Sequence, residues 1–172
     1  MSEAVKDGDS AGLGGKYLTF GLGPEDYAIS ILKVQEIIGM MDVTMVPRMP
    51  AYVRGVINLR GKIVPVIDLR TKFGMERVGR TEETCIIVVD GLAGEMGIVV
   101  DRVSEVLDIL ARDIDPPPAF GASVSTDYLL GIGKTGERVQ LVLDIERVLT
   151  AREAADLPGA SETREEEKRH VR

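Results

Sequence analysis

The sequence predicts an all-β fold in which two small barrels share an apolar core. An internal repeat, a series of short apolar runs and a scarcity of aromatic residues support this prediction. Apolar residues make up 44% of the 172-residue chain, whereas aromatic residues make up only 4% and Trp is absent. The core must therefore consist mainly of Val, Ile and Leu, a composition that suits strands better than helices.

Short apolar runs, separated by Gly, Asp, Asn or charged residues, predict the strands. Several runs alternate with polar residues and others are continuously apolar, as in strands that line a closed barrel. The runs are YLTFGL, YAISI, GVINL, KIVPVIDL, TCIIVVD, MGIVVD, SEVLDIL and RVQLVLDI. Pro65 lies inside one of them, and because proline cannot donate to a ladder we expect it at a sheet edge or a bulge.

The strand pattern occurs twice along the chain. A shift of 69 positions places the segment 26–38 on the segment 95–107, and a shift longer by seven residues places 66–69 on 142–145. The chain therefore contains two copies of one unit. Open sheets of so few strands would expose their edges, so each copy is expected to close as a barrel. Because one barrel of this size is marginally stable alone, the two should share an interface.

Each copy ends in an aspartate that can act as a helix N-cap. Asp68 precedes the sequence LRTKF and Asp144 precedes IERVL. An Asp side chain at this position accepts a hydrogen bond from a free backbone N–H of the first turn. We therefore expect short helices after Asp68 and Asp144.

The ends of the chain differ in composition from the folded part, which is expected to span 16–150. We expect a disordered lead-in at 1–15, lobe one at about 16–75, lobe two at about 76–150 and a charged tail at 151–172. This division allows the ends of the chain to be swapped between the two lobes. The lead-in is small, polar and Gly-rich. The tail fits either a solvated helix or disorder, and Pro158-Gly159 separates it from the fold.

Composition argues against several classes of function. A net charge of −7 and a pI near 4.9 disfavour nucleic acid as a partner. The chain has one cysteine, Cys85, and one histidine, His170. We therefore expect no disulfide framework, no metal site, no cofactor and no enzymatic activity. Neither a signal-peptide layout nor a membrane-spanning apolar stretch is evident, so a cytoplasmic location is expected.

Two features of the first copy break the repeat. The first is the turn Asn58-Leu59-Arg60-Gly61, which has a different sequence in the second copy. Within this turn, Arg60 is either a solvated charge or an arginine clamped by Glu36. The segment 39–50 carries four of the seven methionines. Such a loop can fill a core or form an adaptable docking surface, and docking is favoured because loops normally run over the surface.

The motifs of the chain resemble those of the CheW family over roughly residues 16–150. The matching segments are ILKVQEI at 31–37, GVINLRG at 55–61, VPVIDLR at 64–70, GIVVD at 97–101 and YLLGIG at 128–133. The resemblance implies two intertwined five-stranded SH3-like β-barrels. It also implies a non-enzymatic adaptor that couples chemoreceptors (methyl-accepting chemotaxis proteins) to a CheA-type histidine kinase within membrane-associated arrays.

The same resemblance implies two binding surfaces. One meets the regulatory domain of the kinase, and the other meets the cytoplasmic hairpin tip of the receptor. The kinase-binding residues implied are Val43, Thr44, Val46, Pro47 and Met49. The receptor-binding residues implied are Ile31, Val34, Val99, Val100 and Val103. Glu36 and Arg60 are implied as a supporting clamp.

Three alternatives stay open. A CheW-like adaptor could serve a motility or developmental pathway other than chemotaxis. A small-molecule-binding β-barrel would need a deep polar pocket. A nucleic-acid-binding SH3-like domain is disfavoured by the acidic charge.

Overall fold

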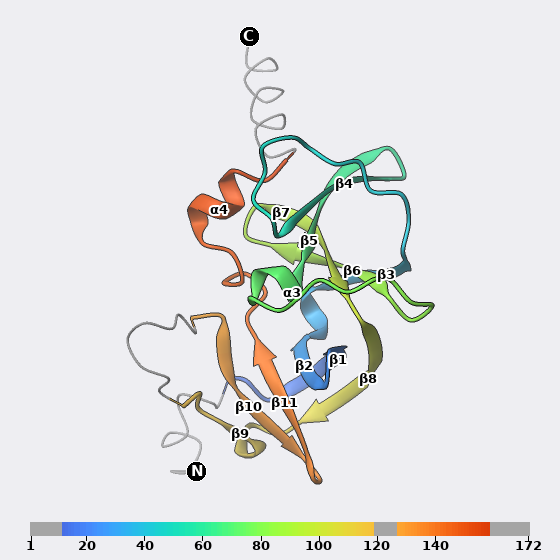
Figure 1. Cartoon of the computed structure of the whole chain (residues 1–172). Helices are drawn as coiled ribbons and strands as arrows, with labels where there is room; N and C mark the ends of the chain where they lie inside the picture. Colours follow the sequence, from blue (N-terminus) through green and yellow to red (C-terminus); the bar gives the residue numbers. More distant parts are fainter. Residues whose placement is uncertain (1–11, 119–126, 159–172) are drawn as a thin grey trace.

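The computed structural model describes residues 12–118 and 127–158, and its strands form two sheets (Figure 1). The first sheet, called the first barrel below although its edge strands are not paired with each other, has the strand order β3 (Val34–Gly39), β6 (Cys85–Gly91), β7 (Gly94–Val100), β5 (Lys62–Asp68) and β4 (Val53–Leu59). The second barrel has the order β8 (Arg102–Ile109), β1 (Gly15–Leu22), β2 (Glu25–Ser30), β11 (Arg138–Leu143), β10 (Leu129–Thr135) and β9 (Ile114–Asp115). The short helical segments are η1 (Ile31–Lys33), α3 (Leu69–Lys72), η2 (Ala111–Asp113) and α4 (Ala151–Ala155). The prediction of a two-part, all-β fold is confirmed.

The two repeat copies exchange their first two strands. Strands β1 and β2 of copy one lie in the second barrel, and the equivalent strands β6 and β7 of copy two lie in the first. The last strand of each copy then pairs in parallel with the second strand of the other: Val66 of β5 aligns with Gly97 of β7, and Val142 of β11 aligns with Ala28 of β2. The barrels are therefore intertwined, and a division near residue 75 separates the repeat copies but not the barrels.

The repeat extends to a detail of the sheet edges. In the second barrel, Asp115 of the two-residue strand β9 pairs with Ile132. At the equivalent place in the first barrel, Thr44 forms an isolated bridge with Val56. The first barrel therefore has five strands and a single bridge where the second has a short sixth strand.

Alternating side chains of the inner strands divide the core into three parts. On β6, Ile86 and Val88 face the interior of the first barrel, whereas Ile87 and Val89 face a core shared by both barrels. The second barrel has its own interior cluster, which includes Ala28. Because these strands bury both faces, their sequences are continuously apolar and do not alternate with polar residues.

A stack of four aromatic rings joins the barrels through the shared core. Phe20 and Tyr27, on β1 and β2, have ring centroids 5.7 Å apart. Tyr27 lies 5.7 Å from Phe73, which follows α3, and Phe73 lies 4.8 Å from Tyr128, which precedes β10. Offset stacking at such separations adds to the stabilisation from burial. Four of the seven aromatic residues of the chain thus lie between the barrels.

The helix expected after Asp68 is present, but the one expected directly after Asp144 is not. The Asp68 side chain accepts a hydrogen bond from the Thr71 N–H at 3.2 Å and caps α3. The Asp144 side chain instead accepts from the Glu146 N–H at 3.0 Å, two residues on, and closes a turn. The helix starts later because Thr150 and Glu153 form a capping box at the start of α4.

The beginning of the expected tail belongs to the fold. Ala154 of α4 is 3% exposed and Leu157 is 4% exposed, and both pack into the shared core. Lys72 of α3 contacts Glu153 at 2.7 Å. The rest of the tail, 159–172, and most of the expected lead-in, 1–11, lie outside the described residues.

Pro65 occupies an inner strand, not a sheet edge. It pairs with Val56 of β4 on one side of β5. On the other side, the ladder between β5 and β7 begins only at Val66. Pro65 therefore comes just before the residues at which β5 pairs with β7, so β7 loses no hydrogen bond through the missing N–H of the proline. For this reason an inner strand can tolerate Pro65.

Candidate partner-binding surfaces

Glu36 and Arg60 lie in contact at the open side of the first sheet. Glu36 is on β3 and Arg60 is in the turn between β4 and β5, and β3 and β4 are the two edges of that sheet. Arg60 Nη1 donates to Glu36 Oε2 at 3.3 Å, and Nη2 contacts Oε1. Hydrogen bonding from Arg60 holds the pKa of Glu36 below its usual value. The pair thus links the two edges by a bidentate contact.

The turn that carries Arg60 has an uncommon backbone. Arg60 adopts φ 54° and Gly61 adopts φ 86°. The Asn58 side-chain oxygen accepts a hydrogen bond from the Gly61 N–H at 2.7 Å. Two successive positive φ values are typical of a tight hairpin turn, in which Gly is favoured and a non-glycine residue is strained. The Asn58 hydrogen bond therefore helps to hold Arg60 in the orientation that reaches Glu36.

The loop between β3 and β4 contains the residues predicted to bind the kinase, and it is anchored at its centre. Thr44 and Val56 exchange two backbone hydrogen bonds, each of 2.9 Å. Gly55 permits this approach, because a Cβ atom there would lie 2.0 Å from the Thr44 carbonyl oxygen. Thr44 and Pro47 are exposed. The loop is therefore a fixed surface feature.

The other three predicted kinase-binding residues are half-buried. Val43 packs against the interior cluster of the first barrel, together with Met40 and Met41. Val46 and Met49 are half-buried at the surface. Part of this loop therefore fills the core, as Met40 and Met41 do, and part faces solvent. Docking by the exposed part stays a prediction.

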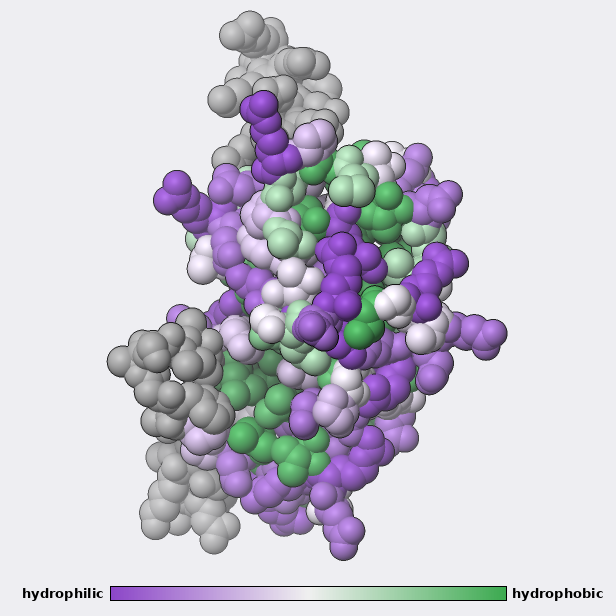
Figure 2. Space-filling view, in the orientation of Figure 1, coloured by the Kyte–Doolittle hydropathy of each residue, from purple (hydrophilic) through white to green (hydrophobic). Residues whose placement is uncertain are grey.

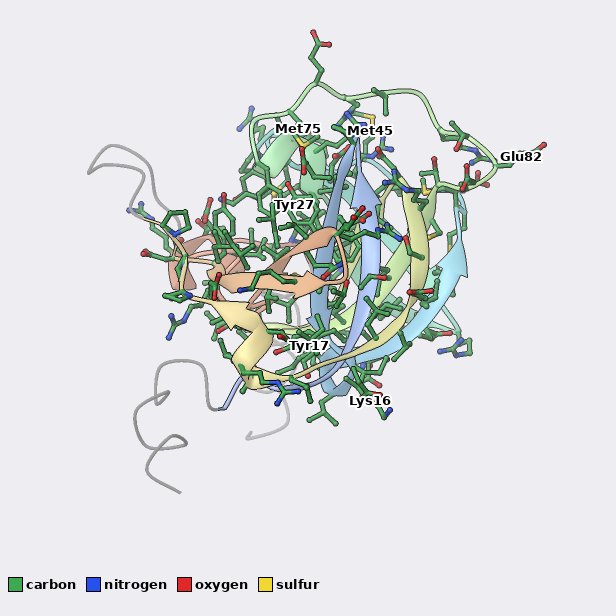
Figure 3. The ribbon with its side chains drawn as sticks, turned by 90° about the horizontal axis from the view of Figure 1, so that it is seen from below. Lys16, Tyr17, Tyr27, Met45, Met75 and Glu82 are labelled. Atoms are coloured by element: carbon green, nitrogen blue, oxygen red, sulfur yellow. The ribbon has the colours of Figure 1, made fainter. Side chains whose placement is uncertain are left out.

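An open groove lies between this loop and the segment that follows α3. Both walls carry methionines and arginines. Its lining includes Met40, Met41, Met45, Met49 and Met75 together with Arg48, Arg54, Arg77 and Arg80. Figure 3 shows Met45 and Met75 on the same side of the molecule, and on the upper part of Figure 2 hydrophobic side chains lie beside strongly hydrophilic ones. We call this feature the Met–Arg groove.

A buried carboxylate supports the arginines of the groove. The Asp68 carboxylate lies 3.5 Å from the Nε atoms of both Arg54 and Arg77, and its side chain is only 5% exposed. Arg77 also donates to the Ala51 carbonyl oxygen at 3.2 Å, which ties one wall of the groove to the other. Asp68, identified from the sequence as a helix cap, therefore also positions two cations.

The residues predicted to bind the receptor fall into two groups. Ile31, Val34 and Val103 are half-buried and pack at the margin of the shared core. Val99 is 7% exposed and Val100 is fully buried. As core residues on β7, neither Val99 nor Val100 can line an exposed groove. A β7 strand buried on both faces explains why two adjacent valines are inaccessible.

An exposed apolar residue beside this group was not predicted from the sequence. Leu32, in η1, is 85% exposed. A signal was available in the repeat, because the shift of 69 positions places Leu32 on the polar residue Asp101. The barrel fold therefore does not require an apolar side chain at the position of Leu32.

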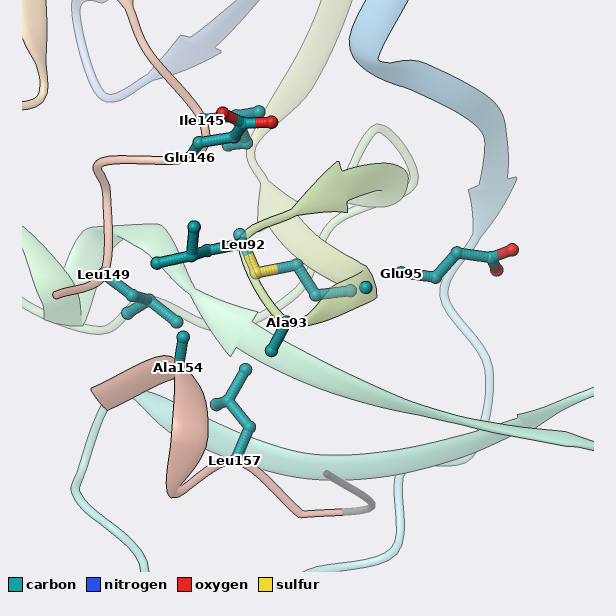
Figure 4. A pocket seen from close by; sticks show the side chains of 10 residues that line it. Leu92, Ala93, Glu95, Ile145, Glu146, Leu149, Ala154 and Leu157 are labelled. Atoms are coloured by element: carbon teal, nitrogen blue, oxygen red, sulfur yellow. The ribbon is translucent and has the colours of Figure 1, made fainter. Parts of the chain in front are cut away.

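A small cavity lies beneath α4, between that helix and the β6–β7 hairpin (Figure 4). Leu92, Leu149 and Leu157 are among its lining side chains. Its volume is about 10 Å³, which is at most enough for a single water molecule. The cavity cannot hold an organic ligand.

The described residues meet neither the requirements of a metal site nor those of a membrane-spanning helix. Within 12–118 and 127–158, no group of three or more His, Cys, Asp or Glu side chains is placed to hold a metal ion. In the same ranges, no helix combines the length and the apolar character needed to cross a bilayer. Burial raises the pKa of the Cys85 thiol, which disfavours the reactive thiolate.

Comparison with known proteins gives a consistent result. The family model described as "CheW-like domain" matches residues 16–153. Chemotaxis protein CheW of Klebsiella aerogenes is 47% identical over 83% of this chain and 86% of its own length, and that of Helicobacter pylori is 38% identical over 78% and 81%. The crystal structure of the scaffolding protein TtCheW from Thermoanaerobacter tengcongensis superimposes with a TM-score of 0.76 at 33% identity, covering 84% of this chain and 99% of that one.

Proposed function

The chain belongs to the CheW-like domain family, and on that premise we propose that it is a non-enzymatic adaptor that couples chemoreceptors to a CheA-type histidine kinase. The observation that carries the proposal is the extent of the family match, because residues 16–153 include every strand of both barrels except the first residue of β1, Gly15. An adaptor of this kind makes and breaks no covalent bond. It acts in the cytoplasm, at receptor arrays on the membrane.

The kinase surface is the outer part of the loop between β3 and β4. Thr44, Val46, Pro47 and Met49 present it, and Val43 supports it from the barrel interior. The Thr44–Val56 bridge favours binding, because a loop already held in one conformation loses less entropy when a partner docks.

The receptor surface lies where the chain crosses from one barrel to the other. Val34 and Val103 are equivalent in the repeat and stand at the beginnings of β3 and β8, directly after those two crossings. Ile31 lies three residues before Val34 in the sequence, and the exposed Leu32 extends the apolar surface. Such a surface suits the apolar face of a helical hairpin. Each contact is weak, and the array supplies avidity through multivalency.

Reconstitution tests the adaptor function directly. The full chain is combined with a CheA-type kinase and membrane-embedded chemoreceptors of the same organism, and autophosphorylation is measured with and without attractant. The expected result is kinase activity that depends on the chain and responds to attractant. Failure of the chain to bind any CheA-type kinase of that organism, in a pull-down with each kinase in turn, would overturn the proposal.

A further inference from the structure

The Met–Arg groove concentrates positive charge on an acidic protein. The chain has a net charge of −7, yet the groove lining contains Arg48, Arg54, Arg77 and Arg80 against one carboxylate, that of Asp42. Behind the lining, Asp68 offsets part of the charge of Arg54 and Arg77. In the part of the chain that the structure describes, neither Arg48 nor Arg80 forms an ion pair, so both charges face the groove uncompensated.

The groove is also rich in methionine. Five of the seven methionines of the chain line it, and Met45 is 83% exposed. Methionine is flexible and polarisable, so a methionine surface adapts to apolar side chains of varied shape. A methionine that is 83% exposed packs little against the folded core, so its side chain is available to a partner at the rim of the groove.

The backbone of Arg48 provides a separate observation. Arg48 adopts φ 63°, a left-handed conformation that is uncommon for residues other than glycine. Strain of this kind persists where surrounding structure enforces it and is concentrated at functional positions. Here it holds, on the loop that forms one wall of the groove, a cation that has no ion-pair partner among the described residues.

We propose that the Met–Arg groove binds an acidic, apolar segment of the kinase's regulatory domain. The methionines receive the apolar side chains of the segment, and Arg48 and Arg80 pair with carboxylates on either side of it. This inference rests on the proposed function and deepens it. It adds residues 75–80 of this chain as a second wall of the proposed kinase surface. It also specifies that the kinase segment that docks there is negatively charged.

Charge reversal tests the inference. Binding of the purified regulatory domain of the organism's own CheA-type kinase is titrated calorimetrically against the full chain at low and at high salt. R48E/R80E is expected to weaken binding about tenfold or more at low salt and to reduce the salt dependence, because attraction between rim charges becomes repulsion. Met45→Gln removes apolar contact at nearly constant length and should weaken binding by a factor of a few at both salt concentrations.

A matched control separates local from global charge effects. R112E/R147E makes the same change in net charge outside the groove, on η2 and on the turn that follows β11. Its affinity should stay within about twofold of the parent. A second charge reversal, made in the kinase regulatory domain, then identifies the carboxylates that pair with Arg48 and Arg80. Substitution of such a carboxylate residue of the docking segment by lysine should restore binding to R48E/R80E.

The outcomes are distinguishable. If the parent chain binds the kinase and R48E/R80E binds with the same affinity and the same salt dependence, the inference is wrong while the proposed function stands. If the parent chain does not bind, the proposed function itself fails. If sedimentation shows that the parent chain self-associates and R48E/R80E does not, the occupant is a second copy of this chain, and the assignment to the kinase is wrong.

Discussion

Arg70 and Asp101 form a two-pronged ion pair that joins the two repeat copies at the junction of the barrels. Arg70 Nη2 lies 2.6 Å from Asp101 Oδ2, and Nε lies 2.8 Å from Oδ1. The Gly23 N–H, in the β1–β2 turn, donates to the same carboxylate at 2.7 Å. The pair thus connects α3, the β1–β2 turn and the crossing from β7 to β8, so it fixes one barrel against the other.

Replacing Asp101 by asparagine should destabilise the fold. The side chains of Arg70 and Asp101 are 15% and 23% exposed, so loss of the carboxylate leaves a largely buried guanidinium without its counter-charge. We expect Asp101→Asn to lower the free energy of unfolding by about 2 kcal/mol, measured by urea denaturation. Asp108→Asn is the control, because the Lys16–Asp108 pair is exposed and should change the value by less than about 0.5 kcal/mol. Equal effects of the two substitutions would contradict this prediction.

The same carboxylate makes stability depend on pH. Hydrogen bonding from Arg70, helped by the Gly23 N–H, lowers the pKa of Asp101 from 3.8. A carboxyl whose pKa is lower in the folded state stabilises the fold above its unfolded pKa, and this contribution disappears as pH falls through the folded pKa. Below about pH 4, the parent should therefore lose its stability advantage over Asp101→Asn. The free energies of unfolding of the parent and of Asp101→Asn are measured by parallel urea titrations. If the difference between them stays constant from pH 7 to pH 3, the Asp101 carboxyl is not the source of the pH dependence.

The repeat predicts the number and order of strands but not their distribution between barrels. A β1–β2 pair can complete the barrel of either copy, because both copies present the same edges and the same apolar alternation. The exchange depends on parallel contacts such as Val66 with Gly97, and these are remote in sequence.

Side-chain burial could be predicted only in part. The contact of Glu36 with Arg60 could be proposed because it joins opposite charges where the repeat breaks, and the structure places these groups together. Val99 and Val100 were misassigned because a strand buried on both faces has the same apolar sequence as one that borders a groove. The role of Asp68 between two arginines was not predictable, since Arg77 reaches it from a loop of irregular structure.

Leu157 tests whether the segment after α4 is part of the fold. Its side chain is 4% exposed and lines the 10 Å³ cavity beneath the helix. We expect Leu157→Ala to lower the free energy of unfolding by about 2–4 kcal/mol, because truncation removes buried apolar area and enlarges a cavity. Leu110, which is 50% exposed, provides the matched substitution, and Leu110→Ala should cost less than about 1 kcal/mol. If Leu157→Ala is as mild as its control in urea denaturation, the segment does not contribute to the core.

Gly55 tests the anchoring of the kinase-binding loop. It adopts φ 140°, and an added Cβ would lie 2.0 Å from the Thr44 carbonyl oxygen. Gly55→Ala should therefore break the Thr44–Val56 bridge, lower the free energy of unfolding by about 2 kcal/mol or more, and speed amide exchange at Thr44 and Val56. Gly39→Ala is the control, because nothing lies within 4 Å of its added methyl group. Unchanged exchange at both amides in Gly55→Ala would show that the loop is held in another way.

Arg60 tests whether the link between the edges of the first sheet serves binding or stability. The Arg60 side chain is 72% exposed, and an exposed ion pair contributes little to the free energy of unfolding. We therefore expect Arg60→Ala to leave the free energy of unfolding, measured by urea denaturation, nearly unchanged. The same substitution should weaken binding of the kinase regulatory domain or of a receptor hairpin fragment by a factor of a few. The reason is that β3, which carries Glu36, begins at Val34 of the proposed receptor surface, and β4 begins after the kinase-binding loop. E36R/R60E restores the opposite charges in exchanged positions and should recover part of the lost affinity. If Arg60→Ala leaves stability and both affinities unchanged, Glu36 and Arg60 form only a solvated surface pair.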